Sequence, residues 1–342
     1  MHLNDIDKMK YALNIPSSLI ISLDYELMWG MMDLPNAKQY GQSNVINVHK
    51  AICEMLKLFE KYQVKVTFAT VGLLMCQDVE EVLLISPKLI PSYTKKWLNP
   101  YGTYLDFVKQ AKSSLYFSPE TVELLKDSKL IEIATHTFCH YYCWEEGQTI
   151  EEFEADIKTA VDVAARKKIE IKSIVFPRNN VNENYLSICH KYGITSYRGN
   201  ALNFYGEKKS LLHFVFRRVC RLLDTYLPIS NQCSYKYDDL NVVEGQSVNI
   251  PASRFFRPYS PQLQMLESVR IFRIKKEMEK AAKLGEMYHL WWHPHNFGAN
   301  MEENLKNLEN VLKHFSYCRE KYGMQTYTMN ELSEILIKKY GK

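Results

Sequence analysis

Short apolar segments alternate with longer amphipathic segments along this chain of 342 residues, and this alternation limits its fold more than any other feature. The apolar runs predict strands at residues 18–24, 64–70, 130–135, 172–176, 194–198, 287–293 and 325–328. Helical spacing predicts helices at 47–62, 119–127, 150–167, 183–192, 266–284, 301–322 and 329–340. Strands that alternate with helices form parallel sheets covered by helices. The sequence therefore predicts an α/β fold, and about seven such units favour a closed (β/α) barrel over an open sheet.

We expect a single domain over residues 1–342, because α/β barrels often run to 250 residues or more as one domain. Its 46% hydrophobic and 24% charged residues are ordinary for a globular protein with a large core. Two stretches, 86–118 and 199–262, break the alternation and are predicted to be long insertions. No GxGxxG pattern follows the first predicted strand, and no GxxxxGK[ST] pattern occurs in the sequence. A nucleotide-binding open sheet therefore has little support.

Charge and hydropathy limit the partners of this chain. The net charge of +4 is small and dispersed, so we expect no nucleic acid partner. No window of about 18 uncharged apolar residues occurs, so we expect no integral membrane segment. The first apolar run, LIISL, is too short for a secretory signal, and the eight scattered cysteines do not resemble a disulfide framework. These features predict a cytoplasmic location.

The most informative motif is His136-Thr137-Phe138-Cys139-His140, directly after a predicted strand. Residues i and i+4 are neighbours on a helical turn, so both imidazoles can face one divalent metal ion such as zinc. The alternatives are a pair of surface or capping histidines, or a structural zinc site that includes Cys139 and Cys143. No second cysteine pair lies nearby to complete such a structural site.

Two carboxylates end the first predicted strand. Alternation along a strand places Asp24 and Glu26 on the same side. One could act as a metal ligand and the other as a general base. Each could also simply cap the helix that follows.

Two further strand ends carry ionisable residues. The window His289-Leu290-Trp291-Trp292-His293-Pro294-His295-Asn296 begins as a strand and ends in a polar turn. We interpret His289 as a core histidine and His293 as a catalytic candidate, because functional residues of barrels lie at the carboxyl ends of the strands. Arg178 follows the predicted strand 172–176 and could pair with Asp24, which would keep that carboxylate ionised.

Taken in chain order, these windows resemble the polysaccharide deacetylase family, which is carbohydrate esterase family 4 with a NodB-like homology domain. SLDYELMWG, VKVTFATVG, EIATHTFCHYY, FPRNNVN, HLWWHPHNFG and QTYTMNEL are similar to successive family motifs. The resemblance covers about residues 17–336, with two insertions. The most specific elements are the His136–His140 pair and the late histidine.

The resemblance implies a distorted (β/α) barrel of seven or eight units. It implies that Glu26, His136 and His140 hold a divalent metal, most often zinc. It also implies catalytic roles for three residues, which are Asp24 as general base, His293 as general acid and Arg178 as the arginine that orients the base. The family usually carries two adjacent aspartates in its first motif, whereas this chain has Asp24-Tyr25-Glu26. The roles of Asp24 and Glu26 could therefore be exchanged.

The function implied by the resemblance is metal-dependent removal of an N-acetyl group from a sugar of a surface polysaccharide or its precursor. Four residues close to the motifs are candidates for contacts with this carbohydrate substrate, namely Trp29, Trp144, His295 and Asn296. Two alternatives remain open. One is hydrolysis of another amide on the same scaffold, such as an N-formyl sugar or a small cyclic amide. The other is a catalytically degenerate barrel that binds glycans.

Overall fold

A parallel sheet forms the centre of the computed structural model, which describes residues 15–201, 224–226, 234–243 and 245–341. Its order is β6-β5-β4-β3-β2-β1-β8-β7, and β9 also pairs with β1. The strands are β1 (Ser18–Tyr25), β2 (Val66–Thr70), β3 (Ile131–Thr135), β4 (Ser173–Ile174), β5 (Ser196–Tyr197), β6 (Val248–Asn249), β7 (Arg254–Phe255), β8 (Met287–Trp292) and β9 (Gln325–Tyr327). All the predicted strands are therefore confirmed in type, and β4 and β5 are shorter than expected.

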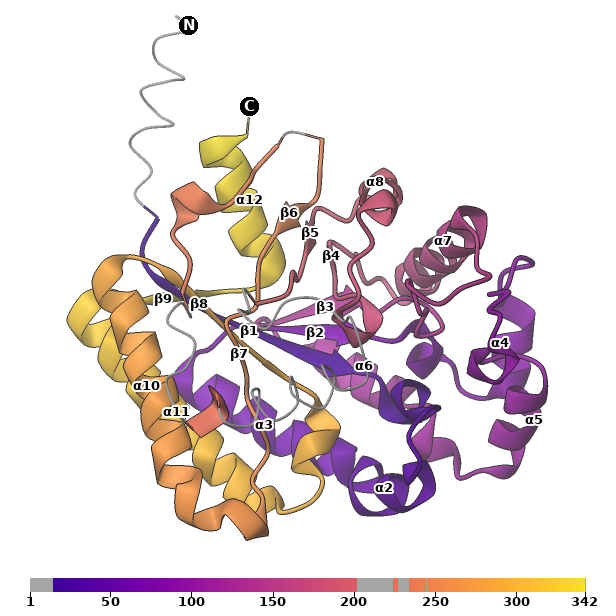
Figure 1. The fold of residues 1–342 in the computed structure, drawn as a ribbon, viewed down its shortest axis with the longest axis horizontal. Coiled ribbons are helices and arrows are strands. Elements are labelled where there is room, and N and C mark those ends of the chain that lie inside the picture. Colours follow the sequence, from indigo (N-terminus) through magenta and orange to yellow (C-terminus); the bar gives the residue numbers. More distant parts are fainter. Residues whose placement is uncertain (1–14, 202–223, 227–233, 244, 342) are drawn as a thin grey trace, which may run out of the picture.

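The sheet curls into a distorted barrel (Figure 1). Its two edge strands, β6 and β7, are joined by residues 250–253 alone, so the edges lie close together. Within this linker, the Ala252 amide donates to the Gly199 carbonyl and the Ser253 amide donates to the His289 carbonyl. The predicted α/β class with a distorted barrel is confirmed.

Helices surround this barrel (Figure 1). They are α2 (Ala37–Ser43), α3 (Val48–Tyr62), α4 (Val79–Ile85), α5 (Thr103–Gln110), α6 (Pro119–Lys126), α7 (Ile150–Arg166), α8 (Glu183–Lys191), α10 (Glu267–Leu284), α11 (Met301–Tyr322) and α12 (Met329–Tyr340). All seven predicted helices are confirmed to within one residue at each end. Within the described ranges, no helix combines the length and the apolar character that a membrane crossing needs.

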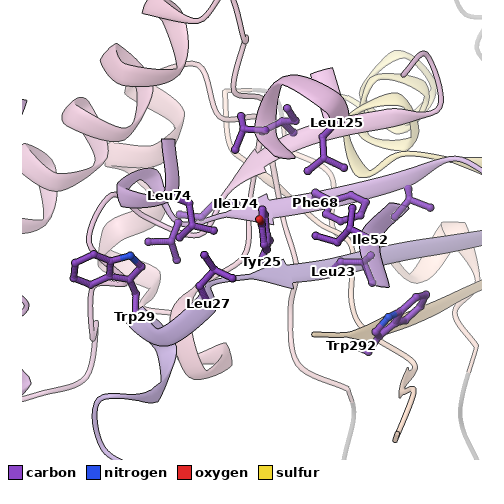
Figure 2. Close-up of a cluster of buried hydrophobic side chains, with 14 of the residues drawn as sticks. Leu23, Tyr25, Leu27, Trp29, Ile52, Phe68, Leu74, Leu125, Ile174 and Trp292 are labelled. Atoms are coloured by element: carbon purple, nitrogen blue, oxygen red, sulfur yellow. The ribbon is translucent and has the colours of Figure 1, made fainter. Parts of the chain in front are cut away.

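Alternation along β1 separates the outer core from the barrel interior. Leu19, Ile21, Leu23 and Tyr25 pack outward in one large apolar cluster against the helices, part of which Figure 2 shows. Ile20 belongs instead to a second cluster inside the barrel, which Met329, Leu332 and Leu336 of α12 complete. Ser22 and Asp24 share the inner face with Ile20 and make polar contacts there. The strand thus supplies apolar packing on one side and functional groups on the other.

The two predicted insertions have different structures. Residues 86–118 contain α5, and their Tyr116 and Phe117 contact the ring of Trp29. Residues 199–262 were predicted to be a long insertion, but the part of them that the structure describes includes β6 and β7 of the central sheet, so this prediction is wrong for those strands. Both strands lie in a polar, turn-rich stretch with no alternating pattern, which explains why the sequence does not reveal them.

We expect Gly298→Ala to destabilise the protein. An added Cβ would lie 1.9 Å from the Asn44 carbonyl oxygen, which belongs to the backbone and cannot rotate away. Overpacking of this kind costs about 1–3 kcal/mol of unfolding free energy. Urea denaturation measures this cost. Gly41→Ala is the matched control, because its φ is not left-handed and its Cβ meets only the flexible side chain of Met28 at 3.0 Å. Equal losses in both variants would contradict the packing argument.

Candidate metal and catalytic site

Three strands of the sheet end at one edge of the barrel and bring the chemical groups together. Asp24 and Glu26 lie at the end of β1, His136 follows β3 directly, and His293 follows β8. The order β3-β2-β1-β8 places these ends within four adjacent strands. Because the strands are parallel, their carboxyl ends meet at the same edge.

A buried carboxylate and two buried imidazoles form a candidate metal site. The Nε2 atom of His140 lies 3.0 Å from Oε2 of Glu26, and that of His136 lies 3.4 Å from the same oxygen. All three side chains are buried. Tetrahedral zinc with bonds of about 2.0–2.1 Å separates its ligand atoms by roughly 3.3 Å. The spacing therefore fits a divalent ion with these residues as ligands.

A hydrogen bond at His136 and burial at His140 leave each imidazole suited to bind a metal ion. The Nδ1 atom of His136 lies 2.8 Å from the Val175 carbonyl oxygen, and an N–H donated there leaves Nε2 with a free lone pair. Burial lowers the pKa of His140, while Glu26 opposes this shift. Neutral imidazole is the form that binds metal.

A side chain of α7 fixes the backbone between the two histidines. The Asp156 carboxylate accepts hydrogen bonds from the amides of Phe138 and Cys139 at 2.8 and 3.1 Å. Burial raises the pKa of Asp156 to about 6, although these amides oppose the shift. His140 itself adopts a left-handed φ of 58°, which a fixed loop must maintain. Asp156 is thus a positioning residue that the sequence analysis missed.

The alternative structural zinc site with two cysteines receives no support in the described ranges. The only candidate metal group found there consists of Glu26, His136 and His140. Burial raises the pKa values of Cys139 and Cys143 well above their usual value, so both remain thiols. Thiols, unlike thiolates, are poor metal ligands.

Asp24 forms a buried ion pair with Arg198, which extends from β5. Two guanidinium nitrogens each lie 2.7 Å from a different carboxylate oxygen. Asn179 and Ser22 accept further hydrogen bonds from the same guanidinium, and the Trp291 ring lies 4.3 Å from it. Burial alone would raise the pKa of Asp24, but Arg198 and nearby histidines hold it below its usual value. Asp24 is therefore an ionised carboxylate.

Arg178 does not orient Asp24, so the role expected from the resemblance is not seen for this residue. Its guanidinium pairs with Asp33 at 2.6 Å and with Glu145 at 3.1 Å, at the rim of the site. The turn after β4 has two successive left-handed residues, Arg178 with φ 57° and Asn179 with φ 54°. This turn leaves Arg178 at the rim, while the Asn179 side chain contacts Arg198 instead. The sequence does contain a signal for Arg198 as the partner of Asp24, because Arg198 ends the predicted strand 194–198.

His293 lies over both carboxylates. Its Nε2 atom is 3.7 Å from Oδ2 of Asp24 and 3.6 Å from Oε1 of Glu26. Its side chain is 23% exposed, so it borders both the buried groups and solvent. The ring stacks on His295 with centroids 4.9 Å apart. This position suits proton transfer to a bound substrate. His289 is the satisfied core histidine expected, bonded to Ser22 and the Ile250 carbonyl.

The four residues expected to contact substrate lie in different environments. Trp29 is completely buried beneath the insertion 86–118, and its indole N–H donates to the Tyr116 carbonyl, so the prediction that it contacts substrate is wrong. Trp144 is 57% exposed at the rim. His295 is buried beneath His293, and burial lowers its pKa to about 3, so it is neutral. Asn296 donates to the Tyr40 hydroxyl.

Gly30 provides the space that the Glu26 carboxylate occupies. A Cβ added at Gly30 would lie 2.2 to 2.4 Å from the carboxylate atoms of Glu26. The short helix Leu27–Met31 that follows Glu26 folds back over it and brings Gly30 into this contact. Any larger residue at position 30 would have to displace the carboxylate from its position beside the two histidines.

Comparison with known proteins agrees with this geometry. Residues 47–197 match the model of the polysaccharide deacetylase family. The resemblance inferred from the motifs is therefore confirmed over these residues. Comparison with curated protein sequences finds no match.

Several solved structures share the fold at low sequence identity. A protein from Mycobacterium smegmatis described as a polysaccharide deacetylase has a TM-score of 0.59 and 11% identity, over 97% of this chain and 93% of its own. One from Pseudomonas aeruginosa PAO1 with the same description has a TM-score of 0.53 and 10% identity, over 94% and 91%. The allantoinase Puue has a TM-score of 0.53 and 9% identity, over 97% and 94%. These likenesses show a shared fold.

We expect Arg198→Met to destabilise the protein by about 3–5 kcal/mol at pH 7, because it leaves a buried carboxylate without its partner. The folded-state pKa of Asp24 lies below its unfolded value, so the pair stabilises the fold above the unfolded pKa of about 3.9 and stops doing so as pH falls through the folded pKa. The difference between variant and wild type should therefore shrink in acid. Urea denaturation between pH 7 and about pH 3.5 measures this.

Arg178→Met is the matched control, because its side chain is 29% exposed and its pairs contribute at most about 1 kcal/mol. A penalty for Arg198→Met as small as that of the control, or one that does not change with pH, would contradict the assigned pairing.

We expect Gly30→Ala to fold and to bind divalent metal at least about tenfold more weakly, because its Cβ displaces the Glu26 carboxylate. Calorimetric titration with zinc measures the affinity directly. Gly41→Ala is the control, since its Cβ meets only the flexible side chain of Met28 at 3.0 Å. Unchanged zinc affinity in Gly30→Ala would show that Glu26 is not a ligand in this position.

Proposed function

We propose that this protein is a metal-dependent N-deacetylase that acts on an N-acetylated sugar of a surface polysaccharide or its precursor. The observation that carries the proposal is the group of Glu26, His136 and His140, whose ligand atoms lie within 4.8 Å of one another beside an ionised Asp24. Zinc is the proposed ion, since two imidazoles and one carboxylate match its usual ligands. The cytoplasmic location expected from the sequence stays a prediction.

Amide hydrolysis needs an activated water, stabilisation of the carbonyl oxygen and a proton for the departing amine. A bound divalent ion would supply the first two, by lowering the pKa of water and by polarising the carbonyl group. Asp24 accepts the proton of the attacking water, because Arg198 keeps the carboxylate ionised and fixed. His293 donates a proton to the sugar nitrogen from its position at the border with solvent.

The arrangement also divides the two carboxylates by role. Asp24 is paired with Arg198, whereas Glu26 contacts His136, His140 and His293 and has no arginine or lysine partner in the described part of the chain. A general base needs a fixed counter-ion that keeps it ionised. A metal ligand instead needs room beside its oxygen atoms for the metal ion. The geometry therefore supports Asp24 as base and Glu26 as ligand, rather than the exchanged roles.

We expect the wild-type protein with zinc to release acetate from N-acetylglucosamine oligosaccharides. Asp24→Asn should lower turnover about 10²–10⁴-fold while zinc still binds, because only the base is lost. Glu26→Gln should weaken zinc binding as well as turnover. Acetate release and zinc titration together distinguish the roles. Asp162→Asn on the exposed face of α7 is the control and should retain both properties.

Two results would contradict this proposal. Loss of zinc binding in Asp24→Asn with normal binding in Glu26→Gln would exchange the two roles. A second contradicting result is release of formate from N-formyl sugars, or ring opening of a small cyclic amide, with no acetate release from any sugar. The protein would then be an amide hydrolase with a substrate other than an N-acetylated sugar.

A further inference from the structure

The outer face of β6 has no helix of its own. In a (β/α) barrel, the segment after each strand normally forms a helix that packs against the outside of the sheet. Here β6 is joined to β7 by residues 250–253 alone, so no helix follows it. Val248 of β6 belongs to the cluster inside the barrel, so Asn249 faces outward, in register with Tyr197 of β5. A cavity of about 840 Å³ lies against this face, and both Tyr197 and Asn249 line it.

The walls of this cavity come from a helix and from a loop segment. Helix α8 forms one wall, and residues 235–243 and 245–247 contribute another. Hydrogen bonds fix the end of the loop segment, because the Ser247 hydroxyl donates to the Ile194 carbonyl at 2.7 Å. The cavity is therefore formed before any ligand binds, as is usual for small-molecule sites.

Two residues that line the cavity each carry a buried polar atom with no hydrogen-bond partner in the described part of the chain. They are His190, through Nδ1, and Asn249, through Oδ1. Gly199 packs against the Asn249 amide, since an added Cβ would lie 2.2 Å from Oδ1. Buried polar atoms without partners cost free energy. Hydroxyl groups can donate and accept, so a hydroxyl-rich ligand can complete such atoms after a small rotation of either side chain.

Two carboxylates give the cavity a negative charge. Glu183 at the start of α8 and Asp239 on the loop wall both line it, and neither forms an ion pair with a described residue. No lysine or arginine is among the described residues that line the cavity. Amides such as those of Asn241 and Gln246 supply hydrogen-bonding groups, and Leu186 supplies apolar surface. This composition favours a cation that carries many hydroxyl groups and disfavours an anion.

We propose that this cavity is a second carbohydrate site that binds amino sugars. Their ammonium groups pair with the carboxylates of Glu183 and Asp239, and their hydroxyl groups bond to the lining amides. An amino sugar is the product of the proposed deacetylation, so the second carbohydrate site binds glycan chains from which N-acetyl groups have already been removed. This inference rests on the proposed function for the source of the amino sugar. It goes beyond that function by assigning a separate binding site on the outside of the barrel.

Calorimetric titration of the zinc-loaded protein tests this site with tetramers of glucosamine, N-acetylglucosamine and glucose. The wild type should bind the glucosamine tetramer about tenfold more tightly than the two neutral tetramers, and added salt should reduce the difference. The double variant Glu183→Gln/Asp239→Asn should lose this preference, because both charges are removed. Ser187→Trp should weaken binding of the glucosamine tetramer by filling the cavity. The control is Glu302→Gln, which changes an exposed glutamate in the first turn of α11 and should keep the wild-type preference.

Acetate release measured on the same samples separates this inference from the proposed function. If the double variant loses the preference for the glucosamine tetramer while the wild type releases acetate from no sugar, the second carbohydrate site is correct and the proposed reaction is wrong. If acetate is released but the double variant and Ser187→Trp bind the glucosamine tetramer as the wild type does, the second carbohydrate site is wrong and the reaction stands. A wild type that does not prefer the glucosamine tetramer also overturns the site, whatever the reaction.

Discussion

Two carboxylates are buried side by side at the end of β1, and the rest of the site is arranged to compensate their charges. Asp24 and Glu26 are both almost fully buried, and two negative charges in such a place are unfavourable unless each is compensated. Arg198 compensates Asp24 through two hydrogen bonds. Glu26 is compensated only by histidines in the described ranges. Because the two carboxylates are compensated differently, Asp24 is suited to act as a base and Glu26 is suited to bind a cation.

The barrel provides the rigid support that this arrangement needs. Each functional group extends from a strand end or from a loop that is fixed by hydrogen bonds, such as the His136–His140 loop held by Asp156. The ion pair of Asp24 is likewise fixed by contacts to its arginine from Asn179 and Ser22. Groups held in this way lose little free energy to reorganisation when substrate binds. The outer apolar core, part of which Figure 2 shows, packs the strands against the helices and so supports the strand ends.

The sequence predicts the helices and the longer strands well, because they have clear periodic patterns. It also identifies the candidate ligands, since Glu26, His136 and His140 each lie close to a predicted strand end and these ends meet in a parallel sheet. It misses β6 and β7, because they lie in a polar, turn-rich stretch without an alternating pattern. It also assigns the arginine to the wrong strand, because the side-chain direction of Arg178 depends on two left-handed residues in one turn. Trp29 is misassigned because its burial depends on Tyr116 and Phe117, which are distant in sequence.

The central claim is that three buried side chains from two strand ends bind one metal ion beside an ionised Asp24. Anomalous X-ray diffraction at the zinc absorption edge, from crystals grown with zinc, tests this claim most directly. We predict one strong anomalous peak within about 2.0–2.2 Å of ligand atoms of Glu26, His136 and His140. A peak bound by Asp24 instead, or full zinc occupancy elsewhere with none between these three residues, would contradict it.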